Sequence, residues 1–159
     1  MAKQDFCYLA PMEINERFRG YLPVVVDLET GGFDRDQHPI LEIACSFLQM
    51  RDDELSIKSA AQWSLNPYPG SIIDPASLKV TKIDIDDPLR EGIEEVDALK
   101  TFFLLVREEM KLAGCHRAVM VAHNASFDQG FLNVACERCN LRRSPFHPFT
   151  ALDTATLGA

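Results

Sequence analysis

Two short apolar runs, each followed by carboxylates, constrain the fold of this chain most strongly. The run 24–26 leads directly into Asp27 and Glu29, and the run 119–121 leads to Asp128. A continuous run of mostly β-branched residues is typical of a strand that is buried on both faces. The pattern therefore predicts two inner strands of a sheet, each ending in acidic side chains.

The remaining periodicity predicts an α/β domain, with a mixed sheet flanked by helices. Apolar residues alternate over 40–50. The spacing of one helix face is followed by Val96, Leu99, Phe103, Val106 and Met110. Three early strands separated by short turns predict an antiparallel meander. Strands are expected over 23–28, 40–50, 57–65 and 118–122, helices over 75–81, 93–113 and 126–140, and a loop over 142–149. Residues 1–20 are expected to form a lead-in to a domain spanning 21–159.

Composition fits one globular domain, and the charge is unevenly distributed. The net charge of −8 over 159 residues argues against nucleic-acid binding by bulk electrostatics. Residues 1–100 carry 10 basic and 19 acidic groups, whereas residues 101–159 carry 6 and 5. No segment approaches the roughly 20 apolar residues of a membrane span. The amino-terminal residues lack a signal pattern, so we expect a cytoplasmic protein with no membrane partner.

The five cysteines do not indicate a disulfide framework, because their number is odd and their spacing irregular. Cys136 and Cys139 form a CxxC pattern, but a zinc site would need a second pair. We therefore expect buried thiols carried on a helix.

The acidic strand ends indicate a divalent-metal site. Alternation places Asp27 and Glu29 on the same side of their strand, where they would repel each other without a cation. Carboxylate oxygens are ligands that Mg²⁺ prefers. A solvated strand end is the alternative for this pair, and a side chain satisfied by backbone is the alternative for His123.

Motifs along the chain carry a resemblance to a known family. The segment 24–33 (VVVDLETGGF) resembles the first motif of the DEDD 3′–5′ exonucleases, and the segment 121–128 (VAHNASFD) resembles the second. Further segments resemble the bacterial ribonuclease T family, namely 17–23, 40–44, 114–124 and 144–149. The resemblance implies a ribonuclease H-like exonuclease fold. It also implies a homodimeric 3′–5′ exoribonuclease that trims tRNA, other structured RNAs and single-stranded DNA.

The resemblance also implies roles for particular residues. Asp27 would bridge two Mg²⁺ ions, for which Mn²⁺ can substitute, while Glu29 would bind one ion and Asp128 the other. Phe33, Phe127 and Phe149 match aromatic positions that stack on terminal bases, with plain core packing as the alternative. A basic patch that grips RNA would comprise Arg17, Arg19, Arg117, Arg142 and Arg143.

Two departures from the family pattern affect these expectations. Ala76 and Val80 stand where the family has an acidic residue and a Phe that read the end base. No His-x4-Asp motif follows the second motif, and His147 with Asp153 has the wrong spacing to replace it. The general base and the last metal ligand would come from that motif, so we expect the fold to be incomplete at its carboxyl end. A proofreading exonuclease subunit and an inactive metal- or RNA-binding fragment are the alternative interpretations.

Overall fold

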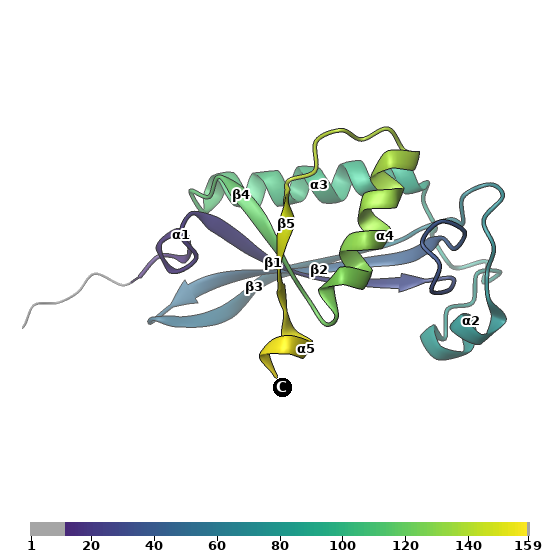
Figure 1. The fold of residues 1–159 in the computed structure, drawn as a ribbon, viewed down its shortest axis with the longest axis horizontal. Coiled ribbons are helices and arrows are strands. Elements are labelled where there is room, and N and C mark those ends of the chain that lie inside the picture. The colour runs from purple at the N-terminus through teal and green to yellow at the C-terminus, as the bar shows by residue number, and fades with distance from the viewer. Residues whose placement is uncertain (1–11, 159) are drawn as a thin grey trace, which may run out of the picture.

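A mixed five-stranded sheet forms the centre of the computed structural model, which describes residues 12–158 (Figure 1). The strand order is β3-β2-β1-β4-β5. The first three strands pair antiparallel, whereas β4 is parallel to β1 and β5 is parallel to β4. The predicted meander and mixed sheet are therefore confirmed. The strands are β1 (Tyr21–Thr30), β2 (Ile40–Arg51), β3 (Glu54–Ser64), β4 (Arg117–Ala122) and β5 (Phe146–Asp153).

The valine run forms the middle of the central strand, as predicted. Val24 and Val26 are 0% and 2% exposed, and they lie opposite Phe47 and Cys45 of β2. On its other edge β1 pairs with β4, so the two strands that precede carboxylates lie side by side. This pairing is what brings the two halves of the candidate site together.

Two longer helices supply most of the remaining core. Their buried side chains join those of β1 and β2 in one hydrophobic cluster, and Phe102 packs against Trp63 and Phe146 with ring centroids 5.6 Å apart. Of the predicted stripe, Leu99, Phe103 and Val106 are buried, whereas Val96 and Met110 are half-buried. The sequence pattern did not identify Phe102, which is fully buried. The helices are α1 (Ile14–Arg17), α2 (Pro75–Thr81), α3 (Glu95–Leu112), α4 (Ala125–Arg138) and α5 (Thr154–Leu157).

The structure corrects two expectations from the sequence. The segment 142–149 is not wholly a loop, because β5 begins at Phe146. Pro145 and Pro148 hid this strand, but proline is tolerated in β5 because it lies at an edge of the sheet. The expected lead-in contains α1, whose Ile14 is 6% exposed and belongs to the core, while residues 1–11 lie outside the described part.

The CxxC thiols lie at the carboxyl end of α4. Cys136 is buried as expected, whereas Cys139 is half-buried and contacts Glu95 at 3.5 Å. Burial raises the pKa of Cys136 to about 12 and that of Cys139 to about 11, so neither thiol is reactive at neutral pH. Within residues 12–158, no helix is long and apolar enough to cross a membrane.

Candidate active site

The carboxyl end of β1 presents two carboxylates on one face of the sheet. Asp27 is exposed and Glu29 is half-buried, while Leu28 between them points into the core. Glu29 lies opposite Glu42 of β2 in the antiparallel register. Burial raises the pKa of Glu29, and the charges of Asp27 and Glu42 raise it further. The sequence prediction that Asp27 and Glu29 share a side of the strand is therefore confirmed.

Asp128 brings a third carboxylate to this strand end from the first turn of α4. Its side chain is 4% exposed, and its Oδ1 accepts the backbone N–H of Leu28 at 3.1 Å. Since Leu28 separates Asp27 from Glu29, this bond fixes Asp128 beside both. Burial raises the pKa of Asp128 to about 6, against the opposing effect of the Leu28 N–H, and the charges of Asp27 and Glu29 add to the rise.

These three carboxylates suit a hard divalent cation by their chemistry. Neither of the two ion pairs found within residues 12–158 involves them, so no lysine or arginine there neutralises the group. Oxygen ligands with concentrated negative charge are what Mg²⁺ and Mn²⁺ bind. Their side chains do not close into a ligand cluster, however. In the described residues, no three His, Cys, Asp or Glu groups are gathered closely enough to hold a metal ion. The metal role of Asp27, Glu29 and Asp128 stays a prediction.

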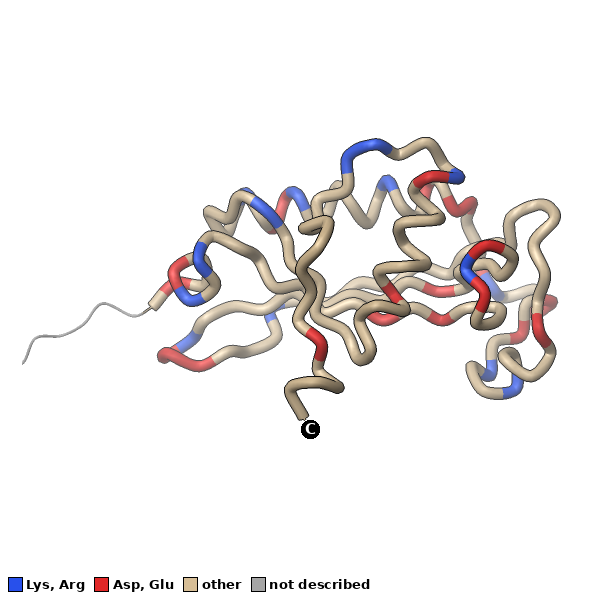
Figure 2. The backbone as a smooth tube through the Cα atoms, viewed as in Figure 1, with Lys and Arg blue, Asp and Glu red and all other residues tan. Residues whose placement is uncertain are grey.

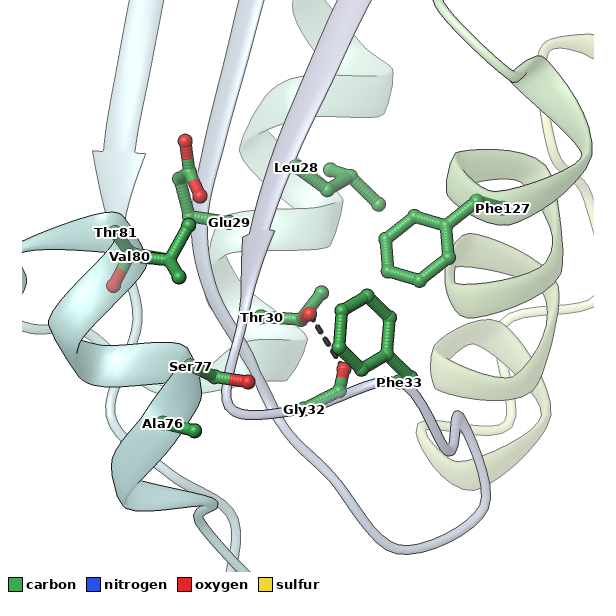
Figure 3. Close-up of a pocket in the computed structure, with 10 residues that line it drawn as sticks. All are labelled: Leu28, Glu29, Thr30, Gly32, Phe33, Ala76, Ser77, Val80, Thr81 and Phe127. Carbon is green, nitrogen blue, oxygen red and sulfur yellow. Dashed lines mark hydrogen bonds between the residues drawn. The ribbon is translucent and has the colours of Figure 1, made fainter.

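A cavity of about 230 Å³ opens beside Glu29 (Figure 3). Phe33 and Phe127 form one wall, with ring centroids 6.2 Å apart in an edge-to-face arrangement. Phe33 is 83% exposed, which is unusual for so large an apolar side chain. The Thr30 hydroxyl donates to the carbonyl of Gly32 at 2.7 Å and fixes the turn that presents Phe33. An exposed aromatic wall next to carboxylates fits a flat, apolar group such as a nucleobase.

Helix α2 forms the opposite wall of this cavity. Ala76 and Val80, the two positions that depart from the family pattern, both line it (Figure 3). This wall therefore offers a small aliphatic surface, with the hydroxyls of Ser77 and Thr81 as the polar groups nearby. The local sequence explains the helix, because Asp74 caps it by accepting the Ala76 N–H at 2.8 Å and Pro75 follows at the first position.

The structure does not bring Phe149 into the cavity with Phe33 and Phe127. Phe149 lies on β5 and is 91% exposed, and the aromatic ring packed near it is that of His147, at a centroid distance of 6.4 Å. The His147 Nδ1 accepts the backbone N–H of Phe149 at 3.2 Å. Asp153 lies at the other end of β5, where its side chain accepts the backbone N–H groups of Asn124 and Ala155. The expectation that His147 and Asp153 do not replace the third motif rests on their spacing in the sequence and stays a prediction.

Three of the five predicted basic residues line one groove. Arg117, Arg142 and Arg143 surround a hollow of about 490 Å³ that also includes Gln129 and His147. Figure 2 shows basic positions on the loop between α4 and β5 and around α1, while acidic positions gather near the end of β1. Arg17 and Arg19 lie at α1 and do not line the groove.

Sequence reasoning missed the role of Asp153. Its Oδ1 accepts the backbone N–H groups of Asn124 and Ala155, each at 3.0 Å, and so joins the end of β5 to the start of α4. Asp followed by Thr before a short helix is a pattern typical of an N-cap, which could have indicated part of this role. The bond to Asn124 depends on strand pairing and has no local signal.

Comparison with known proteins places this chain and its fold among the exonucleases. Residues 24–159 match the sequence model of a ribonuclease T-type exonuclease family, and the chain therefore belongs to that family. The fold is similar to that of E. coli exonuclease I in complex with a 5cy-dA13 oligonucleotide, with a TM-score of 0.67, 14% identity and coverage of 87% of this chain and 29% of that one. The fold is accordingly the ribonuclease H-like exonuclease fold that the resemblance implied.

Relatives of higher identity are ribonucleases T from Shewanella. The chain is 46% identical over 146 residues to ribonuclease T of Shewanella sp. strain W3-18-1, covering 91% of this chain and 66% of that protein. It is 45% identical to ribonuclease T of Shewanella oneidensis, with the same coverage. The chain therefore spans about two thirds of the length of the curated relatives it matches.

Proposed function

We propose that this chain carries the metal- and substrate-binding part of a 3′–5′ exoribonuclease that trims tRNA and other structured RNAs, as well as single-stranded DNA. The observation that carries the proposal is the bond from the Leu28 N–H to Asp128. This bond holds Asp128 at the strand end that carries Asp27 and Glu29, and Glu29 lines the cavity with the exposed aromatic wall. The names of the Shewanella relatives support RNA as the substrate. Those names also favour this proposal over a proofreading subunit.

Within this proposal, the chain's residues divide between holding metal and holding the RNA end. Asp27, Glu29 and Asp128 would bind two Mg²⁺ ions, or Mn²⁺ in their place. When bound, such ions stabilise the attacking and leaving oxygens of the scissile phosphate. Phe33 and Phe127 stack on the terminal base and hold the sugar–phosphate near the carboxylates. The stacking role of Phe149 has no support from the cavity, which Phe149 does not line. The groove lined by Arg117, Arg142 and Arg143 binds backbone phosphates.

The proposal includes a homodimer and a cytoplasmic location. It also includes a third motif that completes the active site. The family resemblance assigns the general base and the last metal ligand to a His-x4-Asp motif after the second motif, and residues 129–159 contain none. General-base catalysis alone contributes about 10²–10⁴ in rate. We therefore expect these 159 residues to trim RNA far more slowly than a full-length ribonuclease T.

An inactive metal- or RNA-binding protein is the second candidate function. The observation that favours it is that residues 129–159 contain no His-x4-Asp motif. Under this alternative the carboxylates and the basic groove still bind their ligands, but phosphodiester hydrolysis does not occur.

Trimming of a 5′-labelled tRNA with Mg²⁺ separates these functions. The full-length Shewanella sp. ribonuclease T serves as the reference, and Asp27→Ala serves as the inactive variant. We expect a slow ladder of shortened products that disappears in Asp27→Ala and after chelation of the metal. Binding without any ladder would favour the alternative. A ladder that persists in Asp27→Ala would show that the carboxylates are not the catalytic groups.

A further inference from the structure

Asp153 ends β5 beside the point at which β4 turns into α4. In the parallel pairing of these strands, Asp153 lies opposite Ala122, the last residue of β4. The turn 123–124 follows, and α4 starts directly after it. The side chain of Asp153 therefore lies next to the turn that leads into the helix carrying Asp128.

One carboxylate oxygen of Asp153 binds the starts of two helices. Oδ1 accepts the N–H of Asn124 and the N–H of Ala155, each at 3.0 Å, and Oδ2 accepts the Thr156 hydroxyl at 3.4 Å. The first N–H groups of a helix have no partner within the helix and carry partial positive charge. Burial acts to raise the pKa of Asp153, but the backbone donors, including Ala155 and Asn124, hold it below its usual value. The carboxylate is thus ionised at neutral pH.

Helix α4 does not provide its own cap. Its N-cap residue, Asn124, is in the left-handed conformation, with φ of 61° and ψ of 54°, and its side chain makes no capping bond. The Asn124 Oδ1 instead accepts the Ser126 hydroxyl at 3.2 Å. A left-handed backbone is unfavourable for residues other than glycine, although asparagine adopts it more readily than most, so contacts from elsewhere help to hold the turn. Asp153 supplies that support from a different strand.

A second side chain of the same segment holds the same turn. The Thr154 hydroxyl donates to the carbonyl of Ala122 at 3.3 Å and lies 3.3 Å from Nδ1 of His123. The Asp153 and Thr154 side chains therefore contact three consecutive residues, 122–124, immediately before α4.

The position of Asp128 depends on this turn. Asp128 lies in the first turn of α4, and its bond to the Leu28 N–H requires that turn to stay close to β1. We propose that Asp153 is a positioning residue of the carboxylate site, acting through the β4–α4 turn to hold Asp128 beside Asp27 and Glu29. The inference rests on the proposed function, because it takes this carboxylate group to be the metal site.

Three variants test the proposal. Asp153→Ala removes both backbone bonds, whereas Asp153→Asn keeps an oxygen that accepts them. Asp87→Ala is the matched control, because the exposed Asp87 also accepts a backbone N–H, that of Leu89 at 2.9 Å, but lies in a loop outside the site. The unfolding temperature of each variant is measured first, so that all binding data are taken on folded protein.

Calorimetric titration with Mn²⁺ gives the first readout. Loss of a residue that orients a metal ligand typically costs 10–100-fold in affinity, and we expect Asp153→Ala to lose about tenfold. Asp153→Asn should recover most of this loss, and Asp87→Ala should match the wild type. A purely structural cap predicts a lower unfolding temperature for Asp153→Ala with unchanged Mn²⁺ affinity, and that result would overturn the proposal.

Amide hydrogen exchange at Leu28 gives a second readout without metal. Its N–H is held by Asp128, so we expect faster exchange in Asp153→Ala but not in Asp153→Asn or Asp87→Ala. If the wild type binds no Mn²⁺, the metal site of the proposed function is wrong, and this exchange experiment alone decides the positioning role. Unchanged exchange at Leu28 in Asp153→Ala would overturn it.

Discussion

Asp128 is a carboxylate held in a site that favours its protonated form. Burial raises its pKa to about 6 from an ordinary value of 3.8. Because the folded pKa lies above the unfolded value, the folded chain binds this proton more tightly. The contribution of Asp128 to stability is thus fully present below about pH 4 and is lost as the pH rises through about 6. Without a metal, ionisation of the Asp128 carboxylate at neutral pH therefore lowers the stability of the folded chain.

Replacing Asp128 with asparagine should therefore stabilise the metal-free chain at neutral pH. The amide oxygen can still accept the Leu28 N–H, while the charge is removed. At roughly 1.4 kcal/mol per pKa unit, we expect a gain on the order of 1–3 kcal/mol near pH 7.5 and little gain near pH 4. Urea unfolding in the presence of a chelator measures the free energy of unfolding of the wild type and of the variant at the two pH values. An equal gain at the two pH values would mean that ionisation of Asp128 is not the source of the cost.

Replacing Phe33 should lower the affinity for an oligonucleotide without lowering the stability of the fold. Its ring is 83% exposed, so Phe33→Ala should change the free energy of unfolding little. Stacking on a base is worth about 1–3 kcal/mol, so the affinity for a single-stranded oligonucleotide should fall roughly fivefold or more. Fluorescence anisotropy measures this loss, with Leu89→Ala, an 85% exposed loop residue, as the control. Equal losses in both variants would argue against stacking.

Phe127 should behave differently because it also belongs to the packing of α4. Its ring lies 4.8 Å from that of Phe131 and 6.2 Å from that of Phe33. Phe127→Ala is therefore expected to lower both stability and oligonucleotide affinity. The salt dependence of binding should stay nearly unchanged, because stacking releases few counterions.

Among the helices and strands, the sequence predicted the elements that are specified by their own neighbouring residues. The valine run identified β1, and the helix expected over 75–81 corresponds to α2. The strand β5 was missed because its extended form depends on pairing with β4, while its prolines indicate a loop. For the same reason, the bond between Asp128 and the Leu28 N–H had no sequence signal, since it is set by how α4 packs on β1. That Asp128 lies near the end of β1 was expected from the resemblance, but the bond that holds it there was not.

The contact between α3 and α4 is held by a largely buried ion pair. Arg138 donates to both oxygens of Glu95, at 2.8 and 2.7 Å, and its guanidinium lies 3.9 Å from the Tyr68 ring centroid. Side-chain exposures of 7% for Glu95 and 24% for Arg138 show that the carboxylate is buried, whereas the arginine keeps partial contact with water. The pair therefore links the end of the site-bearing helix to the core.

Glu95→Ala should destabilise the chain more than loss of a surface ion pair. It leaves Arg138 without its partner, and we expect a loss of roughly 2–3 kcal/mol, somewhat below the value for a fully buried pair. Glu109→Ala is the comparison, because it removes the pair with the more exposed Lys58 and should cost less than about 1 kcal/mol. Chemical unfolding of both variants measures the difference. Similar losses would show that burial does not strengthen the Glu95 pair.

At the scale of the whole molecule, charge is segregated although the chain is acidic overall. The net charge is −8, yet Arg117, Arg142 and Arg143 line one groove, while the carboxylates lie at the end of β1 (Figure 2). The carbonyl of Arg143 also accepts a hydrogen bond from Arg107, which fixes the loop that carries the two adjacent arginines. The sequence alone predicted these basic residues but not that three of the five would share a groove.

Neutralising Arg142 and Arg143 should weaken RNA binding uniformly across sequences. Phosphate contacts carry no sequence information, and each lost contact should flatten the slope of log affinity against log salt by up to about one. Binding titrations at several salt concentrations measure this slope. Lys79→Gln, which removes a charge on α2 away from the groove, is the control. If the double variant kept the wild-type slope, the groove would be ordinary solvated surface.

Calorimetric titration with Mg²⁺ or Mn²⁺ measures whether Asp27, Glu29 and Asp128 form a divalent-metal site in this chain. We expect saturable binding by the wild type that weakens sharply in Asp27→Ala. Asp87→Ala, which changes an aspartate outside the site, should bind as the wild type does. Equal binding by Asp27→Ala and the wild type, or no binding by the wild type, would contradict the account.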